Sequence, residues 1–562
     1  MTDVMTETLG GLAAGAAAFT GRDAAGRAAL ARRTALAVAG VAQGWVEAAV
    51  SIKRGDTIPA LLPTVVAEET ATGPLATLRL LLITARACGE IARHGTPRAA
   101  AAPRVVHRDG AADASFIGID VLPEPWIADR AMFAGHHATV RCGNPGGVDG
   151  FLRSWGEEAR DRPRRGGVAV VLGAGNVTGL AAGDCISQIF EHGRAVLLKL
   201  HPLHAPLAAV LRTALEPLVA CGMLAIVVGD ARVAAEAIAS PLVTHVHLTG
   251  GQDAFDAVVW GGSGPRSDDA RPVLLKPISC ELGGVTPWIV VPGRYTAEQL
   301  GHQADVVAAS IVNNTSFNCI ATKCVVTCRT WDQREEFLAI VARRLASMPA
   351  RPAWYPAALH AWEAVTGSPP PADGTLPWTF RTGIDPAREP HWIEREWFVP
   401  VAVEVPVDAS DIESFCTRAM AFTRRLPGSL AASVTMPEGL AARDRLRVGL
   451  LVEHLEYGTV AVNTWSALAY AFASVPWGGF PGATIAHPRS GIGWVHDPLL
   501  LPLVHNSIVR APLLVRPTPP WFPWHRRADR LTRGVIDIYA SLARGGSGLW
   551  PLVKMLPAVL AG

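Results

Sequence analysis

The chain has 562 residues, of which 49% are hydrophobic and 18% charged, and its formal net charge is +2. This length exceeds what a single hydrophobic core supports, so we expect at least two domains. The composition excludes a disordered chain. The near-neutral charge offers phosphate groups no concentrated basic face, so we expect no nucleic-acid partner.

Nine cysteines are scattered along the chain rather than concentrated as in a small disulfide-bonded scaffold. We therefore expect a reducing, cytoplasmic environment. The first ten residues, MTDVMTETLG, lack the basic start and apolar core of a signal peptide. No stretch reaches the roughly 18 uninterrupted apolar residues of a membrane span. The nearest candidate, residues 498–515, is broken by His505, Asn506 and Arg510.

The first hundred residues and the next sixty differ in pattern. Residues 20–100 are rich in Ala, Arg and Leu at helical spacing, which predicts helices. From 101 to 165 the pattern weakens, and scattered Gly, Pro and Trp favour loops and short strands.

From residue 168 onwards, apolar β-runs alternate with helical stretches. The expected strands are 168–175, 195–200, 224–230 and 243–250, and the expected helices between them are 180–193, 205–222 and 231–240. Strands that alternate with helices at this spacing indicate βαβ units and a parallel sheet.

A polar linker at 261–272 closes this half of the chain, and a second α/β region runs from there to about residue 465. Within it, the Pro- and Trp-rich residues 349–392 have little periodicity and predict a surface excursion. The last fifty residues hold PTPPWFPWHRR and a weakly amphipathic stretch.

A glycine cluster follows the first expected strand. Gly173, Gly175 and Gly179 stand between that strand and a helix, as in a dinucleotide-binding turn, where glycines let the backbone approach a pyrophosphate. The third glycine is one residue late, and Lys199 stands where an acidic residue is expected after the next strand. The alternative is a βα turn that is simply tight.

Further motifs follow in a fixed order along the chain. They are VVLGAGN with Asn176, LLKLHP with Lys199, LTGG with Gly250 and Gly251, ELGG from Glu281 to Gly284, NTSFNCIA with Cys319, EWFVP with Glu396 and Phe398, VAVNT with Asn463, and VPWGG from Pro476 to Gly479. In these elements and in their order the sequence resembles the aldehyde dehydrogenase superfamily, over roughly residues 20–500.

The resemblance implies NAD(P)-dependent oxidation of an aldehyde to a carboxylic acid. Cys319 would attack the carbonyl, giving a covalent thiohemiacetal and then a thioester. The side-chain amide of Asn176 and the backbone N–H of Cys319 would hold the oxyanion. Glu281 would activate water to hydrolyse the thioester. An unperturbed thiol titrates near ~8.5, so the site must lower the pKa of Cys319 or deprotonate it during attack.

The resemblance also implies the cofactor contacts. Lys199 and Glu396 resemble the pair that holds the two ribose groups, and Gly250, Gly251 and Phe398 would lie close to the cofactor. His201, Pro202 and His204 follow Lys199 in place of an acidic residue that favours NAD, so NAD and NADP both remain open.

The implied fold is α/β in three parts. A Rossmann-like cofactor domain would span 1–275, and a smaller α/β catalytic domain with the cysteine nucleophile would span 276–465. A projecting strand element, drawn from near 140–160 and from 466–505, would pair between subunits as in the family's homodimers and homotetramers. Residues 506–562 would form a C-terminal tail.

Three segments depart from the family pattern. Ser316 and Phe317 replace Gly and Gln before the nucleophile, Ala174-Gly175 replace an aromatic residue before Asn176, and Val399 replaces a glycine. Two alternatives to hydrolytic oxidation therefore stay open: transfer of the acyl group to CoA, and a dehydrogenase-like fold that has lost its activity and serves in binding or assembly.

Two further features have competing interpretations. Cys324 and Cys328 follow Cys319 at metal-like spacing, but no His/Cys partners lie nearby, so we expect a buried strand or helix face and no metal. The tail, HRRADRLTR followed by GLWPLVKMLPAVLAG, has the composition of a membrane-surface segment. We favour a packed tail or an oligomer contact over that membrane contact.

Overall fold

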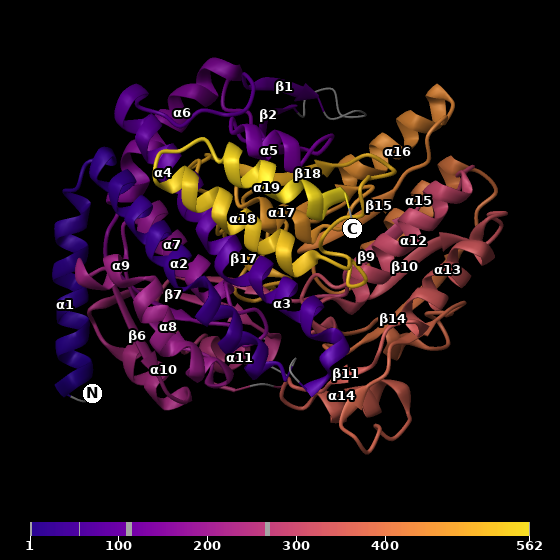
Figure 1. The fold of residues 1–562 in the computed structure, drawn as a ribbon, viewed down its shortest axis with the longest axis horizontal. Helices are drawn as coiled ribbons and strands as arrows, with labels where there is room; N and C mark the ends of the chain where they lie inside the picture. The colour runs from indigo at the N-terminus through magenta and orange to yellow at the C-terminus, as the bar shows by residue number, and fades with distance from the viewer. Residues whose placement is uncertain (1–2, 55–56, 108–114, 263, 265–269, 561–562) are drawn as a thin grey trace.

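The computed structural model describes residues 3–54, 57–107, 115–262, 264 and 270–560. Two large mixed sheets and the helices that cover them make up this α/β fold (Figure 1). Of the expected linker 261–272, residues 263 and 265–269 lie outside the described part of the chain.

The first sheet has six strands in the order β17-β8-β7-β4-β5-β6. Their bounds are β4 (Val168–Leu172), β5 (Ala195–Leu200), β6 (Leu224–Val228), β7 (Val243–Gly250), β8 (Ile278–Leu282) and β17 (Gly491–Ile492). All neighbours are parallel except β17, which runs antiparallel to β8. The parallel sheet predicted from the alternating pattern and the Rossmann-like fold implied by the resemblance are confirmed.

Helices connect these strands and cover both faces of the sheet. The connecting helices are α7 (Leu180–Ile186), α8 (Ala208–Ala214), α9 (Glu216–Ala220), α10 (Ala231–Ala239) and α11 (Gln252–Trp260), with π-helical turn η5 (Ser187–Glu191) extending α7. Strand β4 is buried along its whole length, as a central strand covered on both faces must be.

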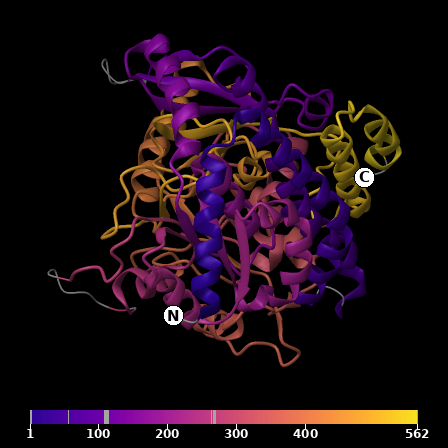
Figure 2. The ribbon, with the colours of Figure 1, turned by 90° about the vertical axis from the view of Figure 1, so that its left-hand side faces the viewer.

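The amino-terminal helices form a layer beside this sheet (Figures 1 and 2). They are α1 (Asp3–Thr20), α2 (Ala24–Ile52), α3 (Leu62–Thr70) and α4 (Ala76–His94), with η3 (Ala71–Leu75) joining the last two. Among the described residues, α2 is the one helix long and apolar enough to cross a membrane, which corrects the expectation that no stretch qualifies. In the fold α2 packs against α4 and α8, and Leu30, Val38 and Trp45 are fully buried.

The second sheet has ten strands in the order β1-β2-β3-β18-β16-β15-β9-β10-β14-β13. Their bounds are β1 (Arg104–His107), β2 (Ser115–Leu122), β3 (His137–Gly143), β9 (Pro287–Val290), β10 (Cys324–Cys328), β13 (Thr379–Arg381), β14 (Val401–Val407), β15 (Ala431–Thr435), β16 (Thr459–Val462) and β18 (Val504–Arg510). The strands from β18 to β13 are parallel, and the four from β1 to β18 are antiparallel.

The helices around this sheet come mainly from the second half of the chain. They are α5 (Ile127–Met132), α6 (Gly147–Asp161), α12 (Ala297–Val312), α13 (Arg334–Ala346), α14 (Ala358–Thr366), α15 (Ile412–Thr423), α16 (Ala442–His454) and α17 (Ala467–Phe472). Helix α12 begins with a capping box in which the Thr296 side chain accepts the Gln299 backbone N–H.

The projecting strand element differs from the expectation. Its strands lie at 104–143 and 504–510, whereas most of 140–160 is helix α6, whose Phe151 and Trp155 are buried four residues apart. Strand β18 pairs with β16 of the same chain, so the element completes the sheet of its own subunit.

Most residues of the insert 349–392 are exposed or half-buried, as expected of a surface excursion, but the insert also has buried anchors. It contains the short strands β11 (Arg351–Pro352) and β12 (Thr375–Leu376) and helix α14. Trp354, Trp362 and Trp392 are all buried in the core of the second sheet. Its low periodicity reflects short elements held by tryptophan packing.

The tail forms two helices, α18 (Ala528–Ala543) and α19 (Leu549–Leu560). Helix α18 lies over α2, α3 and α4 (Figure 1). Inside this contact the Tyr539 hydroxyl and the Asp129 carboxylate both bind the buried Arg79 guanidinium. Helix α19 packs on α18 and α5, and its Trp550 is two-thirds exposed. Figure 2 shows both helices at one side of the molecule.

Candidate active site

A cleft of about 1180 Å³ lies at the carboxyl ends of β4, β5 and β7, where parallel sheets commonly bind ligands. All eight residues singled out from the sequence line it. These are Asn176, Lys199, Gly250, Gly251, Glu281, Cys319, Glu396 and Phe398. They come from both sheets, so folding alone brings them together.

The turn that carries Cys319 joins the end of α12 to β10. Three consecutive residues in it, Asn314, Thr315 and Ser316, have φ angles of 54°, 56° and 61°. Asn tolerates this left-handed region, but Thr and Ser each raise the energy by about 1–3 kcal/mol there. The turn therefore depends on its surroundings to hold this conformation.

Phe317 is one of those surroundings. It is fully buried, and its ring centroid lies 5.1 Å from that of Trp354, 5.5 Å from Tyr355 and 6.0 Å from Phe398. Trp354 and Tyr355 come from the insert, and Tyr355 also lines the cleft. The residue that departs from the family pattern is thus an anchor for the turn.

The thiol of Cys319 donates to the carboxylate of Glu281, with Sγ 3.8 Å from Oε1. The same Oε1 accepts the indole N–H of Trp477 at 2.9 Å. Burial, with the nearby carboxylate of Asp184, raises the pKa of Glu281 to about 7. Burial and the carboxylates of Glu281 and Glu396 raise the pKa of the Cys319 thiol well above its usual value. The resting thiol is therefore protonated, with a base beside it.

Asn176 follows β4 and faces the same turn. Its Nδ2 donates to the Phe317 carbonyl at 3.2 Å, and Asn314 Nδ2 donates to the Asn176 carbonyl at 3.0 Å. A methyl group at Gly175 would overlap the His201 ring, so this imidazole fills space that the missing aromatic residue leaves. The two turns are bonded directly to each other.

The glycine cluster has two roles. Gly173 and Gly175 line the cleft, with Lys199 of β5 beside them. A methyl group at Gly179 would instead overlap the carbonyl of Thr72 in η3. Gly179 therefore allows close packing against the amino-terminal helices. This agrees with the alternative interpretation of a turn that is simply tight.

Glu396 lies over the ELGG turn. The backbone N–H of Gly284 donates to its carboxylate, and burial raises its pKa to about 7, opposed by the nearby Lys323 ammonium. Glu396 Oε1 is buried without a hydrogen-bond partner among the described residues. A buried acceptor at the cleft wall fits a ligand hydroxyl.

Sequence reasoning missed two polar groups of this site. Trp477 lies within the VPWGG motif but carried no assigned role. Lys323 follows the nucleophile by four residues, and its Nζ donates to Ser316 Oγ and to the Val399 carbonyl, each at 2.7 Å. Cys324 and Cys328 are buried on β10, and within the described ranges no group of three His, Cys, Asp or Glu is arranged to hold a metal ion.

Fold and site together define a two-sheet α/β protein with a cysteine and a glutamate beneath a dinucleotide-sized cleft. Residues 154–357, which include Asn176, Glu281 and Cys319, match the family model described as "Aldehyde dehydrogenase family". Over these residues the chain is similar to the aldehyde dehydrogenase family, whose members are oxidoreductases. No curated protein sequence matches it.

Solved structures share the fold at low sequence identity. A mutant aldehyde dehydrogenase C from Pseudomonas syringae, in complex with NAD+ and octanal, is 16% identical with a TM-score of 0.59, over 92% of this chain and 90% of that one. Glyceraldehyde-3-phosphate dehydrogenase from Methanocaldococcus jannaschii, in complex with NADP, is 13% identical with a TM-score of 0.59, over 91% and 94%. 3,6-Anhydro-L-galactose dehydrogenase is 15% identical with a TM-score of 0.58, over 89% and 90%.

Proposed function

We propose that this protein oxidises an aldehyde to a carboxylic acid with NAD+ or NADP+, through a covalent adduct on Cys319. The observation that carries the proposal is the Cys319 thiol 3.8 Å from the Glu281 carboxylate, at the wall of a cleft large enough for a dinucleotide. The reaction consumes the aldehyde, one NAD+ or NADP+ as hydride acceptor, and one water molecule that hydrolyses the thioester.

Attack begins with transfer of one proton. As Cys319 Sγ bonds to the aldehyde carbon, its proton passes to Glu281, whose pKa of about 7 suits a base that works near neutrality. The carbonyl oxygen becomes an oxyanion beside the Cys319 backbone N–H and the Asn176 amide. That amide has two N–H groups, of which one is bonded to the Phe317 carbonyl. Each donor of this kind typically lowers the activation barrier by about 3 kcal/mol.

The bound cofactor supplies the hydride acceptor that turns the thiohemiacetal into a thioester. Glu281 must return its proton to solvent before it activates water against that thioester. Hydrolysis then releases the acid and frees the Cys319 sulfur. One carboxylate therefore serves both half-reactions.

The cleft fits either nicotinamide cofactor. The unpartnered Glu396 Oε1 is an acceptor for a ribose hydroxyl, and Lys199 is a donor on the other side. Lys199 and Lys276 line this side of the cleft and give it a basic character that admits a 2′-phosphate. The structures similar in fold include one complex with NAD+ and one with NADP.

Two other functions compete. Acyl transfer to CoA would not need an activated water, and the position of Glu281 beside Cys319 favours hydrolysis. The unusual residues Ser316 and Phe317 are the reason to consider a fold that has lost its activity. The burial of Phe317 in an aromatic cluster supports a turn built to present the thiol.

An NAD(P)H-formation screen tests the proposal. Short, long-chain and aromatic aldehydes are supplied with each cofactor, with and without CoA, and absorbance at 340 nm is followed. We expect turnover without CoA that Cys319→Ala abolishes and that Cys328→Ala, a buried thiol on β10, retains. Equal rates for wild type and Cys319→Ala, or turnover only with CoA, would contradict it.

We retain a cytoplasmic location and a homodimer or homotetramer as proposals. In the single chain, β18 pairs with β3 and with β16. A tail packed through α18 favours the packed tail over a membrane contact.

A further inference from the structure

A buried ion pair lies behind the active site, on the side away from the cleft. Lys53 follows the last turn of α2, Glu69 belongs to α3, and Nζ lies 2.5 Å from Oε1. The two side chains are only 4% and 1% exposed. Removing two charges from water is costly. A pair this buried is stable only if further hydrogen bonds to both charged groups help to offset that cost.

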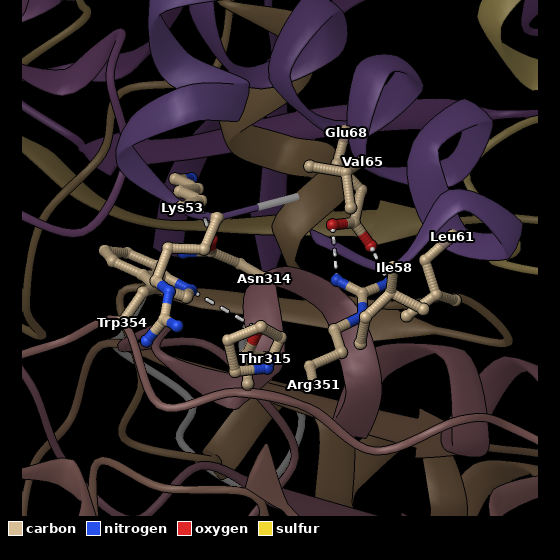
Figure 3. Close-up of a pocket in the computed structure, with 11 residues that line it drawn as sticks. Lys53, Ile58, Leu61, Val65, Glu68, Asn314, Thr315, Arg351 and Trp354 are labelled. Atoms are coloured by element: carbon tan, nitrogen blue, oxygen red, sulfur yellow. Dashed lines mark hydrogen bonds and ion pairs between the residues drawn. The ribbon is translucent and has the colours of Figure 1, made fainter. Parts of the chain in front are cut away.

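The Lys53 ammonium also binds the turn that carries Cys319. Its Nζ donates to Asn314 Oδ1 at 2.7 Å, and Figure 3 shows the two side chains in the wall of a small cavity. Because Oδ1 is held by a cation, the Asn314 amide cannot flip. Its Nδ2 must face the carbonyls of Asn176 at 3.0 Å and Phe317 at 2.7 Å.

The second carboxylate oxygen of Glu69 binds the turn that carries Asn176. Its Oε2 accepts the Thr178 hydroxyl at 3.4 Å, and that hydroxyl accepts the Trp45 indole N–H at 3.2 Å. Thr178 lies two residues after Asn176. The ion pair thus bonds to the turn of Asn176 through one partner and to the turn of Cys319 through the other.

We propose that the Lys53–Glu69 pair is a positioning element that fixes the Asn176 turn against the Cys319 turn, and so sets the geometry of the oxyanion site. The inference rests on the proposed function. Neither residue lines the cleft, so both act through Asn314 and Thr178. Residues 314–316 have left-handed backbone conformations, so the Cys319 turn needs contacts that hold it in place. A strained turn relaxes when such contacts are removed.

A neighbouring ion pair provides a matched control. Arg351 Nη1 lies 2.7 Å from Glu68 Oε2, and these side chains are 3% and 7% exposed. Figure 3 shows this pair lining the same cavity. Among the described residues, the hydrogen bonds of the Arg351 guanidinium go to the Glu68 carboxylate. Removing it tests the effect of losing a buried pair at this place without loosening either turn.

The experiment compares two double variants, Lys53→Met/Glu69→Gln and Arg351→Met/Glu68→Gln. Each removes one buried cation and one buried carboxylate, so neither leaves an unpaired charge. Steady-state kinetics give kcat and the cofactor KM. Hydrogen–deuterium exchange is followed in peptides covering 173–179 and 313–320.

For Lys53→Met/Glu69→Gln we expect kcat to fall roughly 10- to 100-fold, since misplacing reacting groups by about 1 Å has that effect. The cofactor KM should change less than twofold. Exchange should accelerate in the two turns and not elsewhere. For Arg351→Met/Glu68→Gln we expect kcat within threefold of wild type and unchanged exchange in both turns.

A folded Lys53→Met/Glu69→Gln variant with wild-type kcat and wild-type exchange would overturn the proposal. So would equal losses in both double variants. If that variant does not fold, Thr178→Val removes the Glu69 bond to one turn and Asn314→Gly removes the Lys53 bond to the other while keeping the left-handed backbone, and wild-type kcat in both would overturn it. If the wild-type protein oxidises no aldehyde, the proposed function fails, while the exchange rates still decide whether the pair holds the two turns.

Discussion

At the scale of single residues, the chemistry depends on which of two groups holds a proton. Cys319 is a thiol at rest because burial opposes the thiolate, whereas Glu281 has a pKa of about 7. In the proposed mechanism these pKa shifts favour deprotonation of the thiol during attack over a lowered thiol pKa. Glu281 would then act as a base only in its carboxylate form, and its ionisation would control attack.

The pH dependence follows from this assignment. With a pKa of about 7, about a tenth of Glu281 is ionised at pH 6 and about nine tenths at pH 8. We expect kcat/KM for the aldehyde to rise with pH with a midpoint near 7, and Glu281→Gln to be slow and flat over that range. A midpoint that is unchanged in Glu281→Gln would contradict the role of Glu281.

Trp477 tunes the same ionisation. Its indole N–H donates to Glu281 Oε1 and so stabilises the charged carboxylate. Trp477→Phe removes that donor with little change of shape, so the pKa of Glu281 should rise and the midpoint should move to higher pH. The pH–rate profile measures this directly, and a shift to lower pH would show that the indole acts otherwise.

Some site residues stand in recognisable sequence motifs, whereas others are brought to the site only by the fold. Glu281 and Cys319 stand in short motifs, so the sequence was sufficient to single them out. Lys53 reaches Asn314 across 261 residues, and no local pattern marks it. A lysine at a helix end is ordinarily solvated, and only the three-dimensional packing makes this one a buried donor.

At the scale of elements, the parallel sheet was predictable because its strands are continuous apolar runs separated by helices. The strands at 104–143 were not, because β1 is exposed and β2 and β3 mix buried and half-buried residues. Helix α6 was missed where its sequence holds Gly147, Gly150 and Gly156, which weaken a helical pattern. Strand order itself has no local signal.

The ELGG turn yields a prediction about glycine. A methyl group at Gly283 would overlap the Glu396 carboxylate, which is the mobile end of a side chain and can move aside. We expect Gly283→Ala to fold normally but to displace Glu396, lowering kcat/KM for the cofactor roughly 10- to 100-fold, the value of hydrogen bonds to a charged group. Cofactor titration and steady-state kinetics check it.

Gly301→Ala is the matched control. No atom lies within 4 Å of the methyl group that it would add on helix α12. It should retain wild-type kinetics and gain about 0.5–1 kcal/mol of stability, as alanine does in a helix. Equal cofactor affinity in both variants would argue against a cofactor role for Glu396.

At the scale of the whole molecule, the main finding is that one chain completes its own ten-stranded sheet. The family resemblance suggested strands paired between subunits, and residue patterns cannot distinguish a strand paired within the chain from one paired with a copy. The alternation of apolar residues is the same in both cases.

A cross-link distinguishes them. Thr459 of β16 and Ser507 of β18 are register partners, and both are fully buried. In a Thr459→Cys/Ser507→Cys variant, oxidation should link the two strands within one chain. The product should then migrate as a monomer on a non-reducing gel, as should each single variant. A covalent dimer formed only by the double variant would show strand exchange.

The pairing of β3 with β18 also sets an order of events during synthesis. Arg141 of β3 and its partner Asn506 are 365 residues apart. At about 5–20 residues per second, the β2–β3 hairpin waits roughly 20–70 s for its neighbour. Its open edge carries the charged Arg141 in the middle, and charge on an edge discourages pairing with other chains. We therefore expect the guanidinium that binds Asn506 in the folded protein to oppose pairing of the unfinished sheet with other chains during synthesis.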